Sequence, residues 1–300
     1  MKKYSSKTAA RMLVSQRVEL GVSRHARKKH CQQVVTSVAT SRNHRVALTG
    51  LATWLHGKDG KHLKNLNESD AAEYLTLRSM TVSQSAVDLD RQAINFHLLR
   101  DDPIPFILSV IPTEEVDRAY TQGEIAILLE NCGEKLSLSI RLAANAGLRA
   151  VELITIAPVG CLNESNRDWH KERFVGREGD VAFVVHGKGG LRRQVRLAPD
   201  LAAELMQHLR PTPIRVRDRE VIHTSYFDLV SGANYSMQFS ALSKKILGES
   251  HGAHGLRHTF AQKRLRDLLC CGLDCDLALK VLSNELGHFA IKNTLAYLRN

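Results

Sequence analysis

The carboxyl-terminal stretch begins His254-Gly-Leu-Arg-His, continues to Leu286-Gly-His, and reaches Tyr297 near the end of the chain. His254 and Arg257 lie three positions apart at the start of a predicted helix, so both side chains can contact one phosphate. This order of residues suggests a tyrosine nucleophile directed at a DNA phosphodiester. Such a reaction needs further charged groups, which the upstream chain has to supply.

Length and charge set the first bounds. A chain of 300 residues is long enough for about two domains. Lys and Arg number 42 against 31 Asp and Glu, a net charge of +11, and residues 1–50 hold 11 of the basic residues with a single acid, Glu19. A localised basic excess fits a polyanionic partner, most often nucleic acid; a merely solvated basic arm is the alternative.

The sequence indicates neither a membrane segment nor a bound metal. No apolar run approaches the roughly 18 residues that span a bilayer, and the amino terminus lacks a signal sequence. We therefore expect a soluble, cytoplasmic protein with no membrane partner. Cys270, Cys271 and Cys275 lack the CxxC spacing of a zinc site, so we expect small buried side chains there and no metal or cofactor.

Residues 36–99 have the apolar periodicity of helices. The stretch 57–60 contains two glycines that separate the first helix from the second, while 67–70 and 81–84 contain the polar residues typical of helix starts. A small all-helical bundle is the result. By itself such a bundle could equally be a protein-interaction module.

Three of the seven prolines lie within residues 101–115, which makes this segment the best candidate for a linker. We therefore expect a basic amino-terminal arm over 1–35, a helical domain over 36–105, a linker over 106–117 and a second domain over 118–300.

The second domain opens with a helix start at Thr121, followed by helical periodicity that stops at Asn145-Ala-Gly147. The next residues, Leu-Arg149-Ala-Val-Glu152, predict a short helix with Arg149 in its first turn. Exposed amides and the helix dipole favour an anion there, and the guanidinium suits two phosphate oxygens. Glu152 can share a helix face with Arg149 and orient it. Alone, an arginine beside a glycine is more often structural.

A β-hairpin is predicted from the β-rich run 181–186, the glycine-rich turn 187–190 and the alternating strand 191–197. Lys188 lies at its tip. A lysine on such a loop is usually just exposed, but it could also reach a DNA groove and protonate a leaving oxygen.

The remaining segments are predicted more simply. A helix capped by Pro199 runs to Leu209, and residues 210–240 begin with a charged loop to which we assign no role. Tyr297 is expected in a final short helix capped by Asn293 or Thr294. By itself this tyrosine would be taken for a core or surface residue.

Together these motifs resemble, in order and spacing, those of the tyrosine recombinase (phage integrase) family. The resemblance covers nearly the whole chain. It implies a mainly α fold with a small antiparallel β-sheet, in which residues 36–100 correspond to a SAM-like DNA-binding helical bundle and 118–300 to the catalytic domain. The motifs that carry it are Gly-Leu-Arg149-Ala-Val-Glu152-Leu, His-Gly-Lys188-Gly, His254-Gly-Leu-Arg257-His258, Leu-Gly-His288 and Tyr297.

The resemblance also implies a site-specific DNA recombinase or integrase of a mobile element, which forms a 3′-phosphotyrosyl intermediate and frees a 5′-hydroxyl. Six catalytic residues are implied: Arg149 and Arg257 clamp the phosphate, Lys188 is the general acid, His254 assists proton transfer, His288 hydrogen-bonds the phosphate, and Tyr297 attacks.

Cleavage of a phosphodiester by a phenol requires the same chemical groups. A phosphodiester is anionic, and a phenol with an ordinary pKa near 10 is mostly protonated at neutral pH. Two arginines can stabilise the more highly charged transition state without a metal. The leaving alkoxide needs a proton, and a covalent phosphoester intermediate lets strands rejoin without ATP.

The resemblance further implies double-stranded DNA as partner and a homotetramer on two recombination sites, with accessory DNA-bending proteins as further candidate partners. The chain is expected to close around duplex DNA, with contacts from Arg42, Arg45 and Arg192. Only 298–300 follow the nucleophile, which puts the family's usual contact between subunits in doubt. Two alternatives use a similar residue set: a type IB topoisomerase, and a catalytically silent DNA-binding relative.

Overall fold

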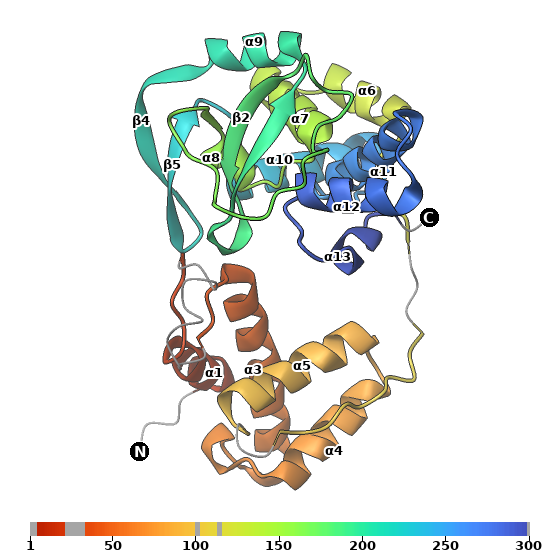
Figure 1. The fold of residues 1–300 in the computed structure, drawn as a ribbon. Coiled ribbons are helices and arrows are strands. Elements are labelled where there is room, and N and C mark those ends of the chain that lie inside the picture. The colour runs from red at the N-terminus through yellow and green to blue at the C-terminus, as the bar shows by residue number, and fades with distance from the viewer. Residues whose placement is uncertain (1–4, 22–33, 100–102, 113–115, 299–300) are drawn as a thin grey trace. The chain divides into compact units, whose positions relative to one another are not determined.

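The computed structural model describes residues 5–21, 34–99, 103–112 and 116–298. They form two compact units, unit 1 over residues 1–114 and unit 2 over 115–300 (Figure 1). Helices dominate both, and two small antiparallel sheets lie in unit 2. The predicted fold class, mainly α with a small antiparallel sheet, is confirmed, with one sheet more than expected. The limits predicted for the individual domains stay predictions.

Unit 1 is a helical bundle around one apolar core. Its elements are α1 (Ser6–Ser15), α3 (Val38–Asp59), η1 (Leu63–Asn65), α4 (Glu68–Ser79) and α5 (Gln84–His97). The core includes the fully buried side chains of Ala10, Val14, Leu48, Leu51, Leu55, Leu75 and Ile94. Part of the predicted basic arm, at 1–4 and 22–33, lies outside the described residues.

Helices α3, α4 and α5 have their limits at the signals that the sequence contains, whereas α1 lies within the predicted basic arm, where no helix was predicted. Gly60 adopts a left-handed conformation (φ 65°) that ends α3. The side chain of Asn67 accepts a hydrogen bond of 2.8 Å from the amide of Asp70 and so caps α4, while Ser83 precedes α5.

The chain after α5 runs in extended form along that helix. Two amide side chains of α5 replace a neighbouring strand: Asn95 hydrogen-bonds both backbone groups of Ile104, at 2.9 and 3.0 Å. Gln84 does the same for the carbonyl of Ile107 and the amide of Ser109, at 3.0 and 2.7 Å. Residues 104–109 are therefore held on unit 1.

Unit 2 contains a three-stranded antiparallel sheet of order β1-β2-β3, formed by β1 (Ala157–Pro158), β2 (Val181–His186) and β3 (Arg192–Leu197). The pairing of β2 with β3 is the predicted hairpin. The turn between them carries Lys188–Gly190 (η2), so the backbone of Lys188 lies at the tip.

A second hairpin joins β4 (Leu209–Asp218) to β5 (Val221–Phe227). The sequence interpretation was wrong here, because it extended a helix to Leu209 and treated the following residues as a loop. Pro211 and Pro213 cannot donate ladder hydrogen bonds, but an edge strand tolerates them. Beyond them, residues 214–218 alternate as a strand does, a pattern that the density of charges obscured.

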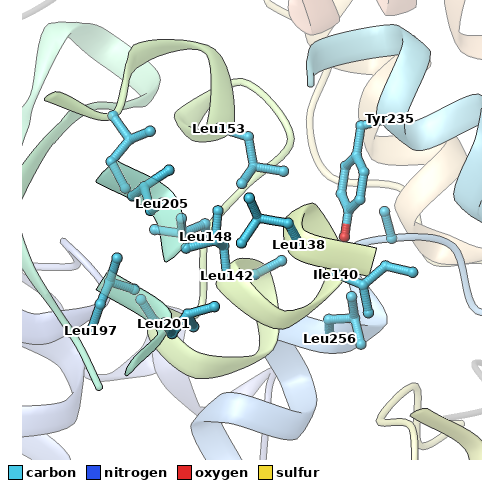
Figure 2. Packing of buried hydrophobic residues seen from close by; sticks show 14 of the residues in the cluster. Leu138, Ile140, Leu142, Leu148, Leu153, Leu197, Leu201, Leu205, Tyr235 and Leu256 are labelled. Carbon is cyan, nitrogen blue, oxygen red and sulfur yellow. The ribbon is translucent and has the colours of Figure 1, made fainter. Parts of the chain in front are cut away.

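The helices of unit 2 surround its core. They are α6 (Gln122–Glu130), α7 (Glu134–Ala146), α8 (Glu152–Thr155), α9 (Pro199–Gln207), α10 (Gly232–Leu247), α11 (Gly255–Cys270), α12 (Cys275–Glu285) and α13 (Lys292–Leu295). Figure 2 shows Leu138, Ile140 and Leu142 of α7 at the centre of this packing, between side chains of the sheet region and of α10 and α11. Helix α7 is thus the element on which unit 2 is assembled.

Three local expectations for unit 2 need correction. The predicted continuous helix from Thr121 to Asn145 divides into α6 and α7 around Gly133. Tyr297 follows α13 and does not lie within it. Cys270, Cys271 and Cys275 are exposed, not buried, because they lie at the solvent-facing end of α11 and the start of α12.

Two kinds of feature are absent from the described ranges. None of the helices there is long and apolar enough to cross a membrane. Nor do His, Cys, Asp and Glu side chains in those ranges gather in a group that could hold a metal ion.

A substitution at Gly147 tests the packing of the loop that follows α7. Its φ is +60°, and a Cβ there would lie 2.5 Å from Cδ1 of Phe260. We expect Gly147→Ala to lower the free energy of unfolding of unit 2 by roughly 2 to 5 kcal/mol, from left-handed strain and overpacking. Denaturant unfolding followed by Trp169 fluorescence in a Trp54→Phe background measures it.

Gly123→Ala is the matched control, since a Cβ at this helical position meets nothing within 4 Å. It should be neutral or stabilise unit 2 by about 0.4 to 1 kcal/mol. Equal effects of the two substitutions would contradict the packing argument.

Candidate active site

A buried carboxylate, that of Glu152 in α8, lies at the centre of a cluster of arginines. Its Oε2 accepts hydrogen bonds from the amide of Arg149 (2.9 Å) and from Nη2 of Arg193 (2.7 Å), and Oε1 accepts from Nη1 of Arg149 (2.8 Å). Nη1 of Arg257 lies 3.8 Å from Oε2. Burial alone would raise the pKa of Glu152, but the guanidiniums of Arg193, Arg149 and Arg257 outweigh it and hold the pKa well below its usual range.

Arg257, in the first turn of α11, is completely buried. It donates to the carbonyl of Gly147 and, at 2.5 Å, to the carbonyl of Leu286. One guanidinium thus joins the loop after α7 to the turn after α12. Burial, then the neighbouring Arg149, lowers the pKa of Arg257 to about 9, so that it stays charged at neutral pH.

The two predicted phosphate-binding arginines converge on one atom. Nη2 of Arg149 lies 3.1 Å and Nη2 of Arg257 3.5 Å from Nε2 of His288. Guanidiniums only donate hydrogen bonds, so Nε2 of His288 must be the acceptor and the ring must carry its proton on Nδ1. The site therefore presents two positive groups directed at one place.

The proton on Nδ1 of His288 begins a short relay of hydrogen bonds. Nδ1 donates to Oγ1 of Thr294 (3.0 Å), which donates to Oγ of Ser283 (2.9 Å), which donates to the carbonyl of His288 (3.1 Å). Burial, with the charges of Arg257 and Arg149, lowers the pKa of His288 to about 3. This ring is consequently neutral, and its tautomer is fixed.

Tyr297 lies against this group with only 9% of its surface exposed. Its Oη is 3.1 Å from Nε2 of His254, and its ring stacks at 5.5 Å on that of His288. The ring of His258 is 4.7 Å away and the guanidinium of Arg257 lies 5.5 Å over the phenol. The hydroxyl thus has a potential proton acceptor within hydrogen-bond reach.

His254 is suited to that part because it is held neutral. Burial, together with the charges of Arg257 and Arg149, lowers its pKa to about 3. A neutral imidazole can accept the phenolic proton and later return it.

No family model matches this sequence, and no curated protein matches it significantly. Solved structures do match it. One is the XerH site-specific recombinase bound to palindromic difH substrate in a post-cleavage complex, with a TM-score of 0.57 at 15% identity over 99% of this chain and 94% of that one. Another is a lambda integrase tetramer bound to a Holliday junction, with a TM-score of 0.52 at 14% identity over 91% of this chain and 75% of that one. The chain has the tyrosine recombinase fold.

Within this fold, unit 2 gathers five of the six predicted catalytic residues: Arg149, His254, Arg257, His288 and Tyr297. The sixth, Lys188, has its backbone at the tip of the β2–β3 hairpin, and its side chain lies outside the description. The adjoining Gly187 ties this tip to the cluster, because a Cβ there would lie 2.5 Å from Oε1 of Glu152. The role of Lys188 stays a prediction.

The structure adds Arg193, which sequence reasoning missed. This completely buried arginine donates to Glu152 and, at 2.9 Å, to the carbonyl of Glu285. Its neighbour Arg192, predicted as a DNA contact, is half-buried at the start of β3 and its amide donates to Oγ of Ser165. The alternation of β3, with Val195 and Leu197 buried, was the signal that Arg193 points inward.

The other two predicted DNA contacts are in unit 1, on α3. Arg42 is exposed and Arg45 half-buried. Their contact with DNA stays a prediction.

The lowered pKa of His288 predicts a pH dependence of stability. In the unfolded chain a histidine has a pKa near 6.5, so as pH falls from 6.5 towards 3 the unfolded state gains a proton that the native state does not. Stability is therefore lost on acidification. Between pH 7 and pH 5 we expect His288→Asn to lose about 2 kcal/mol less than the wild type, measured by denaturant unfolding of unit 2.

His62→Asn, at an exposed histidine of unit 1, controls for the loss of one surface imidazole. An unchanged pH dependence in His288→Asn would contradict a neutral buried ring.

Proposed function

We propose that the chain is a site-specific DNA recombinase or integrase, which cuts and rejoins strands through a 3′-phosphotyrosyl intermediate without metal or ATP. The observation that carries this proposal is the convergence of Arg149 and Arg257 on one atom beside the Tyr297 ring, with His254 at the phenol. The tyrosine recombinase fold supports it.

Substrate binding begins at the two converging guanidiniums. The scissile phosphate takes the place towards which Nη2 of Arg149 and Nη2 of Arg257 point, and its non-bridging oxygens accept their hydrogen bonds. Nε2 of His288 fills that place in the structure, so the ring has to move aside when the phosphate binds, and it can hydrogen-bond a phosphate oxygen once Nε2 carries the proton. Such a site is preorganised, because Glu152 and Arg193 fix the guanidiniums before DNA arrives.

Cleavage follows from this geometry. Oη of Tyr297 attacks the phosphorus and passes its proton to Nε2 of His254, 3.1 Å away. A P–O bond to tyrosine forms while the bond to the 5′-oxygen breaks, and Lys188 protonates that leaving oxygen. The phosphoester energy is conserved, so a 5′-hydroxyl of another strand can reverse the reaction.

The arginine cluster favours the transition state over the bound substrate. Three guanidiniums and one carboxylate leave a surplus of two positive charges when the histidines are neutral. A phosphodiester carries about one negative charge, and the pentacovalent transition state carries more. Electrostatic stabilisation therefore increases as the reaction proceeds, which is the condition for catalysis.

Partners are proposed on the same basis. Duplex DNA is the substrate, contacted also by unit 1 through Arg42 and Arg45. A homotetramer acts on two recombination sites of a mobile element in the cytoplasm, with accessory DNA-bending proteins as further partners. The likeness to a lambda integrase tetramer on a Holliday junction supports this assembly.

The nucleophile is tested by trapping. Duplexes selected by the full chain from a random pool, then nicked near the cleavage position so that the released end diffuses away, should accumulate a covalent protein–DNA adduct visible on denaturing gels. We expect Tyr297→Phe to abolish the adduct, because the other hydroxyls beside His288, those of Thr294 and Ser283, lie on the Nδ1 side of its ring, away from the arginines.

Tyr235→Phe is the control, since the buried hydroxyl of Tyr235 has no hydrogen-bond partner in the described ranges. An adduct that persists in Tyr297→Phe would refute the proposed nucleophile. Relaxation of supercoiled plasmid without recombinants or sequence preference would favour a type IB topoisomerase, and tight binding without any adduct would favour a silent DNA-binding relative.

A substitution at Arg193 tests whether the arginine cluster is preorganised, because this buried side chain acts only through Glu152 and the carbonyl of Glu285. A lysine cannot reproduce its planar fork. We expect Arg193→Lys to slow adduct formation about 10- to 100-fold, through misplacement of Arg149 and Arg257, while DNA affinity changes little.

The matched control is Arg196→Lys on the same strand, where the guanidinium donates to the carbonyl of Asp180, away from the site. Equal slowing in both variants, or loss of affinity instead of rate in Arg193→Lys, would contradict the positioning role.

A further inference from the structure

The β4–β5 hairpin carries an exposed basic face that has no part in the proposed reaction. Arg215 and Arg217 alternate on β4, opposite Thr224 and Ile222 on β5, and all four are exposed. Arg219 follows at the tip, exposed as well. We call Arg215, Arg217 and Arg219 the hairpin arginines.

The hairpin arginines lack acidic partners. Elsewhere in unit 2 arginines are paired, as Arg141 is with Glu204 and Arg210 with Asp228. No ion pair within the described ranges involves any of the three hairpin arginines. Their charge is therefore available to an outside anion.

The opposite face of the hairpin is bound to the catalytic unit. Strand β5 packs against α8, and Phe227 is buried beside Phe183 of β2, with ring centroids 6.1 Å apart. Val216 and His223, which pair across the strands, are half-buried. One face is thus structural, which leaves the arginine face for contact with a partner.

The tip is anchored to the loop that carries Arg149. Oδ1 of Asp218 accepts a hydrogen bond of 2.8 Å from the amide of Ala233, and the amide of the preceding Gly232 donates to the carbonyl of Ala150 at 2.9 Å. Ala150 directly follows Arg149. In Figure 1 the tips of both hairpins of unit 2 lie at the edge where α13 also lies.

The turn itself indicates a role for its side chain. Arg219 has a φ of 57°, a conformation that glycine or asparagine adopts more easily. An arginine there strains the backbone, because its Cβ lies close to the following carbonyl oxygen. Retained strain of this kind points to a function for the residue that bears it.

We propose that the hairpin arginines bind the phosphate backbone of the duplex beside the scissile phosphate, as a DNA contact outside the catalytic cluster. Arg215 and Arg217 are two residues apart on one face, about 7 Å by strand geometry, so both reach the same backbone. A two-stranded ribbon of this kind also fits a major groove. The contact rests on the proposed function, because it requires duplex DNA at the site.

The charge of the hairpin arginines favours DNA as their partner over a second copy of the chain. Three arginines without an ion pair in the described ranges outnumber the two acids of the same tip, Asp218 and Glu220, and so suit a polyanion. Phosphate contacts position a duplex without reading its bases. The hairpin therefore holds the DNA against Arg149 and leaves sequence reading to other surfaces.

The test measures affinity of the full chain for a selected duplex as a function of salt. Each phosphate contact adds about 0.9 to the slope of log K against log salt. Arg215→Ala/Arg217→Ala should lower that slope by nearly 2 and weaken binding at low salt about 10- to 100-fold. Arg215→Lys/Arg217→Lys keeps both charges and should keep most of the slope.

Lys244→Ala/Lys245→Ala is the control with the same loss of charge. These exposed lysines end α10, about 18 Å along the helix from Gly232. The control should bind as the wild type does, and circular dichroism verifies that all variants are folded. An unchanged slope in the alanine hairpin variant, an equal loss in the control, or a change only in self-association overturns the proposed contact.

The outcome also separates this contact from the proposed function. If the wild type binds duplex DNA and forms the Tyr297 adduct while the hairpin variants match it, the hairpin proposal alone fails. If the wild type binds no duplex DNA at any salt concentration, both fail.

Discussion

The ion cluster around Glu152 is the interaction on which unit 2 depends. One completely buried carboxylate holds two guanidiniums by hydrogen bonds and lies near a third. Removing one partner from such a buried cluster costs about 3 to 5 kcal/mol, because the remaining charges stay desolvated. The cluster also joins three segments distant in sequence: the loop after α7 together with α8, then β3, and α11. Its integrity therefore fixes the fold and the site together.

The cluster also explains why the surrounding histidines are neutral. Every imidazole placed beside Arg149 and Arg257 is buried next to positive charge, and both effects disfavour protonation. A neutral ring can accept a hydrogen bond. Nε2 of His288 can therefore lie in front of the two arginines, and Nε2 of His254 can lie beside the hydroxyl of Tyr297. Burial and fixed positive charge together thus keep the histidines around Tyr297 neutral.

The sequence predicted most of the fold and most of the site's membership. Caps and glycines at Gly60, Asn67, Thr121 and Gly147 mark helix limits, because they act locally. Arg193 was missed because its role depends on which strand face is buried, and Arg192 beside it looked equivalent. The relay through Thr294 and Ser283 was missed because residues eleven apart meet only after α12 and α13 have packed.

The β4–β5 hairpin was not predicted, because its sequence lacks the pattern by which strands are usually recognised. Its strands carry charges at alternate positions, and such a stretch looks like a solvated loop when no apolar face is visible. The partly buried face near the tip consists of residues as unlike as Val216, Asp218 and His223, because this end packs against α8 and the start of α10, whereas Phe227 at the other end of β5 lies in the apolar core. A strand with one polar structural face and one basic outer face loses the apolar alternation by which strands are recognised. Thr224 and Ile222 stand opposite Arg215 and Arg217, so no cross-strand ion pair reveals the pairing of β4 with β5 in the sequence either.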